Sequence, residues 1–345
     1  MEPAIVASTT ALPFDLRYLM FLQEWRLSIN GSLDWFMENI SLFSISIWLP
    51  IIAAIIYWCF NKRIGSLIFM NNGFGDLINN VVKLSCCIYR PWIRSSLIKP
   101  AGDAIKTAGG YSFPSGHTQC ITSYFGTSAI LTWTKKKLFA IISLLIIFTV
   151  AFSRNYLGVH TPEDVVVGFL FGFGVIFFNM WIYEKLEKDR KTDTIYLLSG
   201  LSFGLTMLVY FTCKNYPIEI NPATGKILVD PQIMMNDAFA ATGRYFGWLI
   251  GWYLETQFIK FEIKGSKKEL IIRALIGVVS LYFVNKIPKT FWTNDLHFGM
   301  HAAYFIRAFI PYFYLIGIYP LIIKLSKPLF AQKVESVSSV SSNSI

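Results

Sequence analysis

The sequence predicts an all-α, polytopic membrane protein, that is, a bundle of transmembrane helices. Its 345 residues are 54% hydrophobic and only 15% charged, and the mean hydropathy is +0.48. Stretches of about 20 apolar residues, the length that crosses the hydrocarbon core of a bilayer, recur along the chain. This composition is too apolar for a soluble protein of the same length, so it excludes that class.

Nine stretches have the length of a membrane span, which predicts about nine crossings. Five contain no Asp, Glu, Lys or Arg: residues 41–60, 116–134, 138–153, 165–183 and 194–213. The other four carry one to three charged residues each: 64–85, 237–256, 270–287 and 299–323.

The spans divide the chain into four parts. Residues 1–40 form an interfacial segment, because charged residues among Phe, Leu and Trp over 14–40 favour an amphipathic helix lying on the membrane. Residues 41–190 form the core, and residues 191–330 add further transmembrane helices. The Ser-rich tail, 331–345, is predicted to be disordered.

Basic residues cluster in the loops on one side of the predicted bundle. The positive-inside rule makes this side cytoplasmic, so residues 86–115 and 153–164 lie on the extracytoplasmic side of a plasma (inner) membrane. The net charge of +10 is therefore a topology signal and does not indicate nucleic acid binding. Seventeen of the 31 basic residues lie on the cytoplasmic side: Lys62, Arg63, Lys135, Lys136, Lys137, Lys185, Lys188, Arg190, Lys191, Lys260, Lys264, Lys267, Lys268, Arg273, Lys324, Lys327 and Lys333.

One predicted span carries a polar face. Asp76, Asn79 or Asn80, and Lys83 recur at helical spacing and share one side of the helix. Ionisable groups inside a span face a wet or functional interior, so this face is expected to line the floor of a site. Asp76 is expected to pair with Lys83 or another cation, or to make a hydrogen bond that packs the helices.

Two small-residue motifs allow helices to approach closely. They are Gly168-x-x-x-Gly172 and Gly247-x-x-x-Gly251. They favour packing inside the bundle, with a homodimer contact as the alternative.

No metal site is expected. The five cysteines show no C-x-x-C spacing. His297 and His301 lie four residues apart but lack a clear third ligand.

Three stretches on the extracytoplasmic side stand out: KLSCCIYRP (83–91), YSFPSGH (111–117) and SRNYLGVHTPED (153–164). Together they spell K-x6-R-P, P-S-G-H and S-R-x5-H-x3-D, in that order. This set resembles the three-part signature of the type 2 phosphatidic acid phosphatase superfamily, which includes glucose-6-phosphatase and bacterial undecaprenyl pyrophosphate phosphatases. All eleven specified positions match, so the resemblance is specific over about residues 40–190. It implies a membrane phosphatase that needs no metal.

The signature's cations suit phosphate chemistry. A phosphoryl group in transfer carries negative charge on its oxygens, and cationic donors around those oxygens stabilise it. Lys83, Arg90 and Arg154 supply such donors, and each arginine fork can bind two oxygens at once. Taken singly, the arginines also suit lipid headgroups and Lys83 suits a helix end. Three cations on one side, together with two histidines, favour the phosphate site.

Ser115, Gly116 and His117 begin a predicted span, where backbone N–H groups lack helical partners. Such a helix terminus binds anions, and Ser115 adds a hydroxyl donor. An ordinary N-cap serine after Pro114 explains the same residues, and both roles can hold together.

The resemblance also assigns the histidines. It implies that His160 attacks phosphorus and becomes a phosphohistidine, that His117 protonates the leaving oxygen and later activates water, and that Asp164 orients His160. Residues 161–164 also fit a helix start with a capping box and proline at the first helical position. Such a cap accounts for Asp164 and Glu163 but not for His160.

We therefore expect a metal-independent phosphatase, without a cofactor, that hydrolyses a phosphate or pyrophosphate ester of a phospholipid or polyprenyl substrate at the extracytoplasmic face. One alternative is a phosphotransferase that passes the phosphoryl group to another lipid or sugar. Another is a transporter carried by the additional helices, although the intact signature argues against it. Six esters stay open: undecaprenyl pyrophosphate, phosphatidic acid, phosphatidylglycerol phosphate, lipid A phosphate, sphingoid phosphate and a sugar phosphate.

Overall fold

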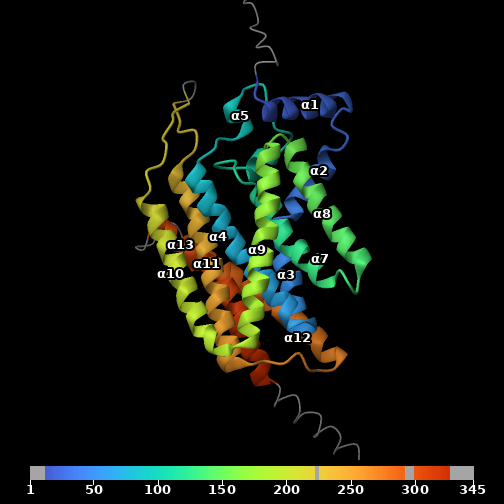
Figure 1. Cartoon of the computed structure of the whole chain (residues 1–345), viewed down its shortest axis with the longest axis vertical. Coiled ribbons are helices and arrows are strands. Elements are labelled where there is room, and N and C mark those ends of the chain that lie inside the picture. Colours follow the sequence, from blue (N-terminus) through green and yellow to red (C-terminus); the bar gives the residue numbers. More distant parts are fainter. Residues whose placement is uncertain (1–11, 222–224, 292–298, 327–345) are drawn as a thin grey trace, which may run out of the picture.

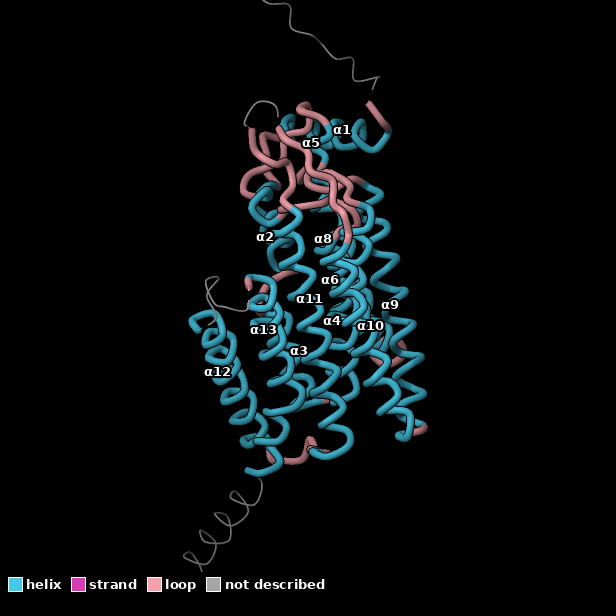
Figure 2. The backbone as a smooth tube through the Cα atoms, turned by 90° about the vertical axis from the view of Figure 1, so that its left-hand side faces the viewer, coloured by secondary structure: helices cyan, strands magenta, loops and turns pink. Residues whose placement is uncertain are grey.

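The computed structural model describes residues 12–221, 225–291 and 299–326, without the side chains of 288–291. Within these residues the chain is helical, and its only β-structure is an isolated bridge between Ile220 and Ile227. Most helices run along one common direction, and many of the loops gather at one end of the bundle (Figures 1 and 2). The predicted all-α class is confirmed. The predicted disordered tail lies outside the described residues.

The N-terminal part contains two helices where one interfacial helix was predicted over 14–40. Helix α1 (Phe14–Ser28) lies across the end of the bundle (Figure 1). A turn through Gly31, at φ +65°, leads to α2 (Asp34–Phe43). Helix α3 (Trp48–Ile55) and the π-helical turn η2 (Ile56–Phe60) continue from α2 after a bend of 46°. The interfacial location of this segment stays a prediction.

Helices from the next part of the chain hold the three signature motifs. They are α4 (Lys62–Cys86), α6 (Gly116–Ile121) continued by η4 (Thr122–Gly126) and α7 (Thr127–Thr132), α8 (Lys137–Tyr156) and α9 (Pro162–Lys188). Helix α9 approaches the start of α6 so closely that a Cβ atom on Gly168 would lie 2.6 Å from the carbonyl oxygen of Ser115. Glycine at this position therefore brings the second and third motifs together.

The long loop between α4 and α6 folds over the same end of the bundle. It contains α5 (Pro91–Arg94) and the 3-10 turn η3 (Ala104–Thr107). The loop is tied to α1, because Arg94 forms an ion pair with Asp15 at 2.5 Å and the Lys99 backbone N–H donates to Gln23 at 2.7 Å. The N-terminal helix thus positions the loop that carries the end of the first motif.

The rest of the chain adds four long helices: α10 (Asp193–Cys213), α11 (Pro231–Leu254) with η6 (Glu255–Ile259), α12 (Lys267–Phe291), and α13 (Met300–Phe313) with η7 (Tyr314–Ile318). Helix α11 contacts α4, α10 and α13. A Cβ atom on Gly247 would lie 2.5 Å from the carbonyl oxygen of Phe309, and one on Gly251 would lie 3.2 Å from the amide of Gly317. This small-residue motif therefore packs α11 against α13 and η7 within the chain.

Helices occupy most of each of the nine stretches predicted as spans, although the bend at residues 44–47 interrupts the first, and the stretches differ in length and apolarity. Five described helices are long and apolar enough to cross a membrane, or six if the bent α2–α3 pair forms one span. The helices α4 and α11 fall short of this test because polar side chains interrupt them, and the stretch from α6 to α7 is short. The count of nine crossings is not confirmed and stays a prediction.

Candidate active site

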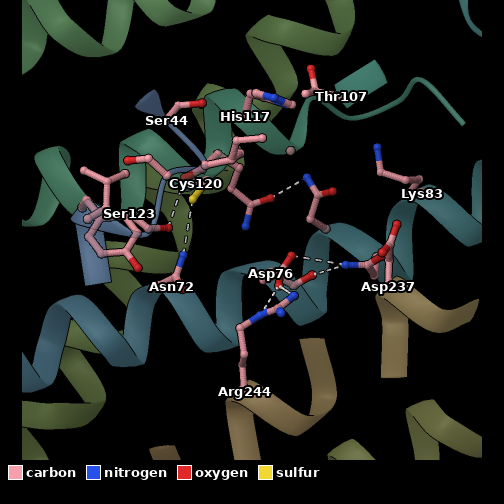
Figure 3. A pocket seen from close by; sticks show the side chains of 18 of the residues that line it. Ser44, Asn72, Asp76, Lys83, Thr107, His117, Cys120, Ser123, Asp237 and Arg244 are labelled. Carbon is pink, nitrogen blue, oxygen red and sulfur yellow. Dashed lines mark hydrogen bonds and ion pairs between the residues drawn. The ribbon is translucent and has the colours of Figure 1, made fainter. Parts of the chain in front are cut away.

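The three signature motifs meet at a cavity of about 670 Å³. Polar side chains from α4 and α11 also line it (Figure 3). Three predicted site residues are buried but are not among the residues that line the cavity: Ser115, Arg154 and Asp164. The other five line it directly: Lys83, Arg90, Gly116, His117 and His160.

His160 is oriented by a buried carboxylate. Its Nδ1 lies 3.1 Å from Asp164 Oδ2, and that oxygen also accepts hydrogen bonds from the Ser112 hydroxyl at 2.5 Å and the Thr161 N–H at 2.9 Å. A carboxylate accepts and does not donate, so the imidazole proton lies on Nδ1. The other ring nitrogen, Nε2, is therefore unprotonated.

Arg90 confirms this tautomer from the other side of the ring. Its Nη1 lies 2.8 Å from His160 Nε2, and because a guanidinium only donates, Nε2 is the acceptor. The remaining Arg90 bonds go to the backbone carbonyls of Val159, Gly109 and Gly110, at 3.0 to 3.2 Å. Burial lowers the pKa of Arg90 to about 10, which leaves it charged at neutral pH.

The environment of His160 favours a neutral ring. Burial removes water from the ring, and the nearby charges of Arg90, Arg154 and Lys83 repel an added proton. Together they hold the pKa of His160 well below its ordinary value.

Arg154 and His117 carry buried nitrogen atoms that have no described hydrogen-bond partner. The Arg154 side chain is 1% exposed, its Nη1 donates to the Ser41 hydroxyl, and its Nε and Nη2 have no partner within the described part of the chain. His117 Nε2 is also buried without a described partner. A buried cationic donor without an acceptor is costly, so this arrangement suits an anion that arrives from outside.

Lys83 forms hydrogen bonds with the backbone of the second motif. Its Nζ donates to the carbonyl oxygens of Tyr111, Ser112 and Pro114, at 3.3, 3.4 and 2.8 Å. An ammonium group has three N–H donors, and all three have acceptors here. Lys83 therefore holds the loop before α6 and adds positive charge to the site.

The two helix starts that the sequence suggested are both present. The Ser115 hydroxyl caps α6 by accepting from the Thr118 N–H at 3.4 Å, and the Ser115 N–H donates to the Asp164 carbonyl at 2.9 Å. Thr161 and Asp164 form a reciprocal capping box at the start of α9. Asp164 thus both caps its helix and orients His160, so the structural and the functional interpretation hold together.

The sequence prediction did not identify the role of Ser112, and it left open which cation pairs with Asp76. Ser112 contacts both Asp164 and His160, although only its position inside the YSFPSGH stretch hinted at this. Asp76 pairs with Arg244 of α11, whose Nε lies 2.8 Å from Asp76 Oδ2, and not with Lys83. The predicted polar face of α4 does line the cavity, through Asp76, Asn79, Asn80 and Lys83.

A helical membrane bundle in which two histidines and buried cations surround one cavity defines a class of protein that binds and transfers phosphate-like anions. Residues 65–188 match the family model of the PAP2 superfamily, and residues 239–329 match that of the PAP2 superfamily phosphatase, transmembrane extension. The two models together cover more than half of the chain, which therefore belongs to the PAP2 superfamily of membrane phosphatases. The predicted family is confirmed.

Several curated relatives share part of this sequence. The undecaprenyl-diphosphatase of Sulfolobus acidocaldarius is 27% identical over 42% of this chain and 70% of its own length. The phosphatidylglycerophosphatase B of Bacillus subtilis is 31% identical over 37% of this chain, and the match spans 62% of that relative, less than two thirds. The lipid A 4'-phosphatase of Bacteroides thetaiotaomicron is 28% identical over 48% of this chain and 77% of its own length. No solved structure matches the chain significantly.

Proposed function

We propose that this protein is a metal-independent lipid phosphatase that hydrolyses a phosphate or pyrophosphate ester through a phosphohistidine intermediate at the extracytoplasmic face. The observation that carries the proposal is the state of His160. Its Nε2 is unprotonated and faces cationic donors, while Asp164 holds the proton on Nδ1. This is the arrangement that an attacking histidine requires.

In the proposed reaction, His160 Nε2 attacks phosphorus as the bond between phosphorus and the leaving oxygen breaks. His117 gives a proton to that oxygen, which departs as an alcohol or a phosphate. His117 then takes a proton from water, the water oxygen attacks the phosphohistidine, and phosphate leaves. Arg90 and Arg154 neutralise the charge on the transferring group, and Lys83 keeps the loop before α6 in position.

The distribution of basic residues supports the extracytoplasmic location. Helix α4 begins at Lys62 and Arg63 and reaches the cavity through Lys83, near its other end. Helix α9 begins beside His160 and ends at Lys185 and Lys188. The basic clusters and the site therefore lie at opposite ends of the same helices, as the positive-inside rule requires for an outward-facing site.

Purified protein in lipid vesicles should release free phosphate from a lipid phosphate or diphosphate, and EDTA should leave the rate unchanged. Strong EDTA inhibition would contradict the metal-independent mechanism. Transfer of labelled phosphate to a second lipid, without release, would support the phosphotransferase alternative. Absence of both reactions with the lipids named above and with p-nitrophenyl phosphate would overturn the proposal.

The pH profile should carry the signature of a neutral nucleophile. Only unprotonated His160 can attack, so a lowered pKa keeps the enzyme active to lower pH, and activity is lost as pH falls through that pKa. The acid limb of kcat/KM for p-nitrophenyl phosphate is expected below pH ~6.5, the ordinary histidine value. This substrate has a good leaving group, which reduces the demand for the general acid.

Arg90→Gln supplies the comparison, because it removes one cation that lowers the pKa of His160. Its acid limb should move to higher pH, even though its maximal rate falls. The same substrate is used with the unmodified protein and with the variant, so ionisation of the substrate does not contribute to the difference between their acid limbs. A limb that does not move, or that lies above 6.5 in the unmodified protein, would contradict the assignment.

A further inference from the structure

A second cavity, of about 540 Å³, lies between α9 and α10. Helix α9 packs on α4, and α10 packs on α11. The helices α4 and α11 lie between α9 and α10 in Figure 1 and form the floor of the cavity. We call this cavity the lateral groove and define it by six of its lining residues: Phe74, Phe178, Ile182, Lys185, Ile195 and Tyr245.

The lateral groove is apolar and opens to the outside of the bundle. Phe178 of α9 is 49% exposed, and Ile195 of α10 is 65% exposed. Both helices are long and apolar enough to cross a membrane, so the groove faces the lipid of the bilayer. The rings of Phe74 and Tyr245 close the floor, with their centroids 5.6 Å apart. An apolar chain fits this groove, because an empty space would cost the lining residues their packing contacts.

One end of the lateral groove is polar. Lys185, in the last turn of α9, and Thr192, directly before α10, line the groove where the two helices are joined. Lys185 Nζ lies 3.5 Å from the centroid of the Trp181 ring, which is itself exposed. A tryptophan and a lysine at the end of an apolar helix lie at the level of the lipid headgroups.

The segment that joins α9 to α10 presents a net positive charge beside the groove. Its glutamates are engaged elsewhere, since Glu184 and Glu187 lie 3.7 and 3.0 Å from Arg63 of α4. Asp193 is buried inside the bundle, and the Asp189 carboxylate caps the turn. Three lysines form no ion pair with any residue that the structure describes: Lys185, Lys188 and Lys191. A basic cluster beside a groove between transmembrane helices is typical of a site for an anionic lipid headgroup.

The floor of the lateral groove is the outer side of the wall of the catalytic cavity. Phe74 and Asp76 lie two residues apart, which places them about 200° apart around α4. Asp76 lines the catalytic cavity, and its ion-pair partner Arg244 precedes Tyr245 on α11. Phe74 belongs to the segment that matches the PAP2 model, and Tyr245 belongs to the segment that matches the extension. The groove therefore lies at the junction of the two segments.

We propose that the lateral groove binds an anionic phospholipid that is not the substrate. One acyl chain lies against the rings of the groove, and the headgroup phosphate lies at Lys185 and Thr192. The lipid fills the junction between the catalytic segment and the extension and supports the wall behind the ion pair of Asp76 and Arg244. Its headgroup is distant from the catalytic site, because α9 rises about 35 Å between its start beside His160 and Lys185.

A second copy of the chain fits the lateral groove less well than a lipid. Two copies that insert in the same orientation have their basic ends at the same level of the membrane. A twofold contact through the groove would bring the lysines of one copy close to the same lysines of the other, and like charges repel. A phosphate headgroup instead complements them.

Two phospholipids with identical acyl chains test the headgroup. Phosphatidylglycerol, which is anionic, and phosphatidylcholine, which is zwitterionic, are added separately to the delipidated full-length protein in detergent. Native mass spectrometry measures the bound lipid, and thermal unfolding measures the Tm. Phosphatidylglycerol should bind at least about 5-fold more tightly and should raise the Tm more. Equal binding of the two lipids would overturn the proposal. The measurement needs no turnover, so its outcome is independent of the proposed phosphatase function.

Lys185→Gln tests the position of the headgroup. Loss of one cation should lower the affinity for phosphatidylglycerol about 5-fold and leave that for phosphatidylcholine unchanged. Lys137→Gln is the matched control, because Lys137 Nζ also lies over a tryptophan ring, 6.0 Å from the centroid of Trp133, but outside the groove. An unchanged affinity in Lys185→Gln, or an equal loss in Lys137→Gln, would contradict the proposed site.

Ser199→Trp tests the position of the acyl chain. Ser199 lines the groove and makes no described side-chain hydrogen bond, so the variant should fold while its indole fills the groove. The affinity for both lipids should fall at least about 10-fold. Leu205→Trp introduces the same side chain at an exposed position of α10 outside the groove and should bind both lipids normally. Unchanged lipid binding in Ser199→Trp would overturn the proposal. A lipid-free dimer of the unmodified protein that dissociates in Ser199→Trp would also overturn it, in favour of a second copy.

Discussion

His160→Asn is expected to abolish phosphate release, with a loss of kcat/KM of at least about 10⁴-fold, because the variant has no ring nitrogen to form the covalent intermediate. The direct measurement uses labelled substrate and separates the protein at alkaline pH, because the phosphorus–nitrogen bond of a phosphohistidine breaks in acid. The unmodified protein should carry label on a histidine during turnover, and the variant should carry none.

His117→Asn is the matched comparison for this prediction. It keeps the nucleophile, and p-nitrophenyl phosphate needs little help from a general acid, so the phosphoenzyme should still form. Hydrolysis of that intermediate needs His117 to activate water, so labelled protein should accumulate. Label on the His160→Asn protein, or equal losses of labelling in both variants, would contradict the assigned roles.

Arg154→Met is expected to lower kcat/KM on the order of 100- to 1000-fold, the cost of removing one donor that stabilises a transition state. Its effect on stability separates the anion-binding role from a structural one. Arg154 is buried with two unpartnered nitrogens, so its neutral replacement should leave the Tm of the free protein unchanged or raise it. Phosphate or vanadate, which should raise the Tm of the unmodified protein, should raise that of the variant much less.

Ser41→Ala serves as the control, because it removes the one described side-chain partner of Arg154 but keeps the guanidinium. Its activity should stay within about 10-fold, and phosphate should still raise its Tm. A lower Tm for the free Arg154→Met protein, combined with a normal response to phosphate, would show that Arg154 has a structural role only.

Much of the fold could be predicted from hydropathy, because each long helix has its own apolar run. The number of membrane crossings could not be confirmed in the same way, since α4 and α11 are less apolar than the other long helices. Their polar residues, such as Asp76, Asn80 and Arg244, line the cavity or lie beside it. A polar residue lowers the mean hydropathy of a helix whether it faces a cavity or water. Hydropathy alone therefore cannot distinguish a transmembrane helix that lines a cavity from a helix outside the membrane.

The site was predictable to the extent that its residues belong to motifs. Lys83, Arg90, His117 and His160 lie at one cavity, as the signature led us to expect. The pairing of Asp76 with Arg244 spans 168 residues and follows only from the packing of α11 on α4. Local spacing carries no information about such a pair, and the extension has no motif that points to it.

The ion pair between Asp76 and Arg244 also has a consequence for biogenesis. During synthesis the carboxylate of α4 precedes its cationic partner by 168 residues, so the early helices insert with a charge that is not yet compensated. A chain interrupted before α11 therefore retains an unpaired acid within its helical core and lacks one wall of the cavity. Such a product should be less stable than the full chain, which favours its removal by quality control.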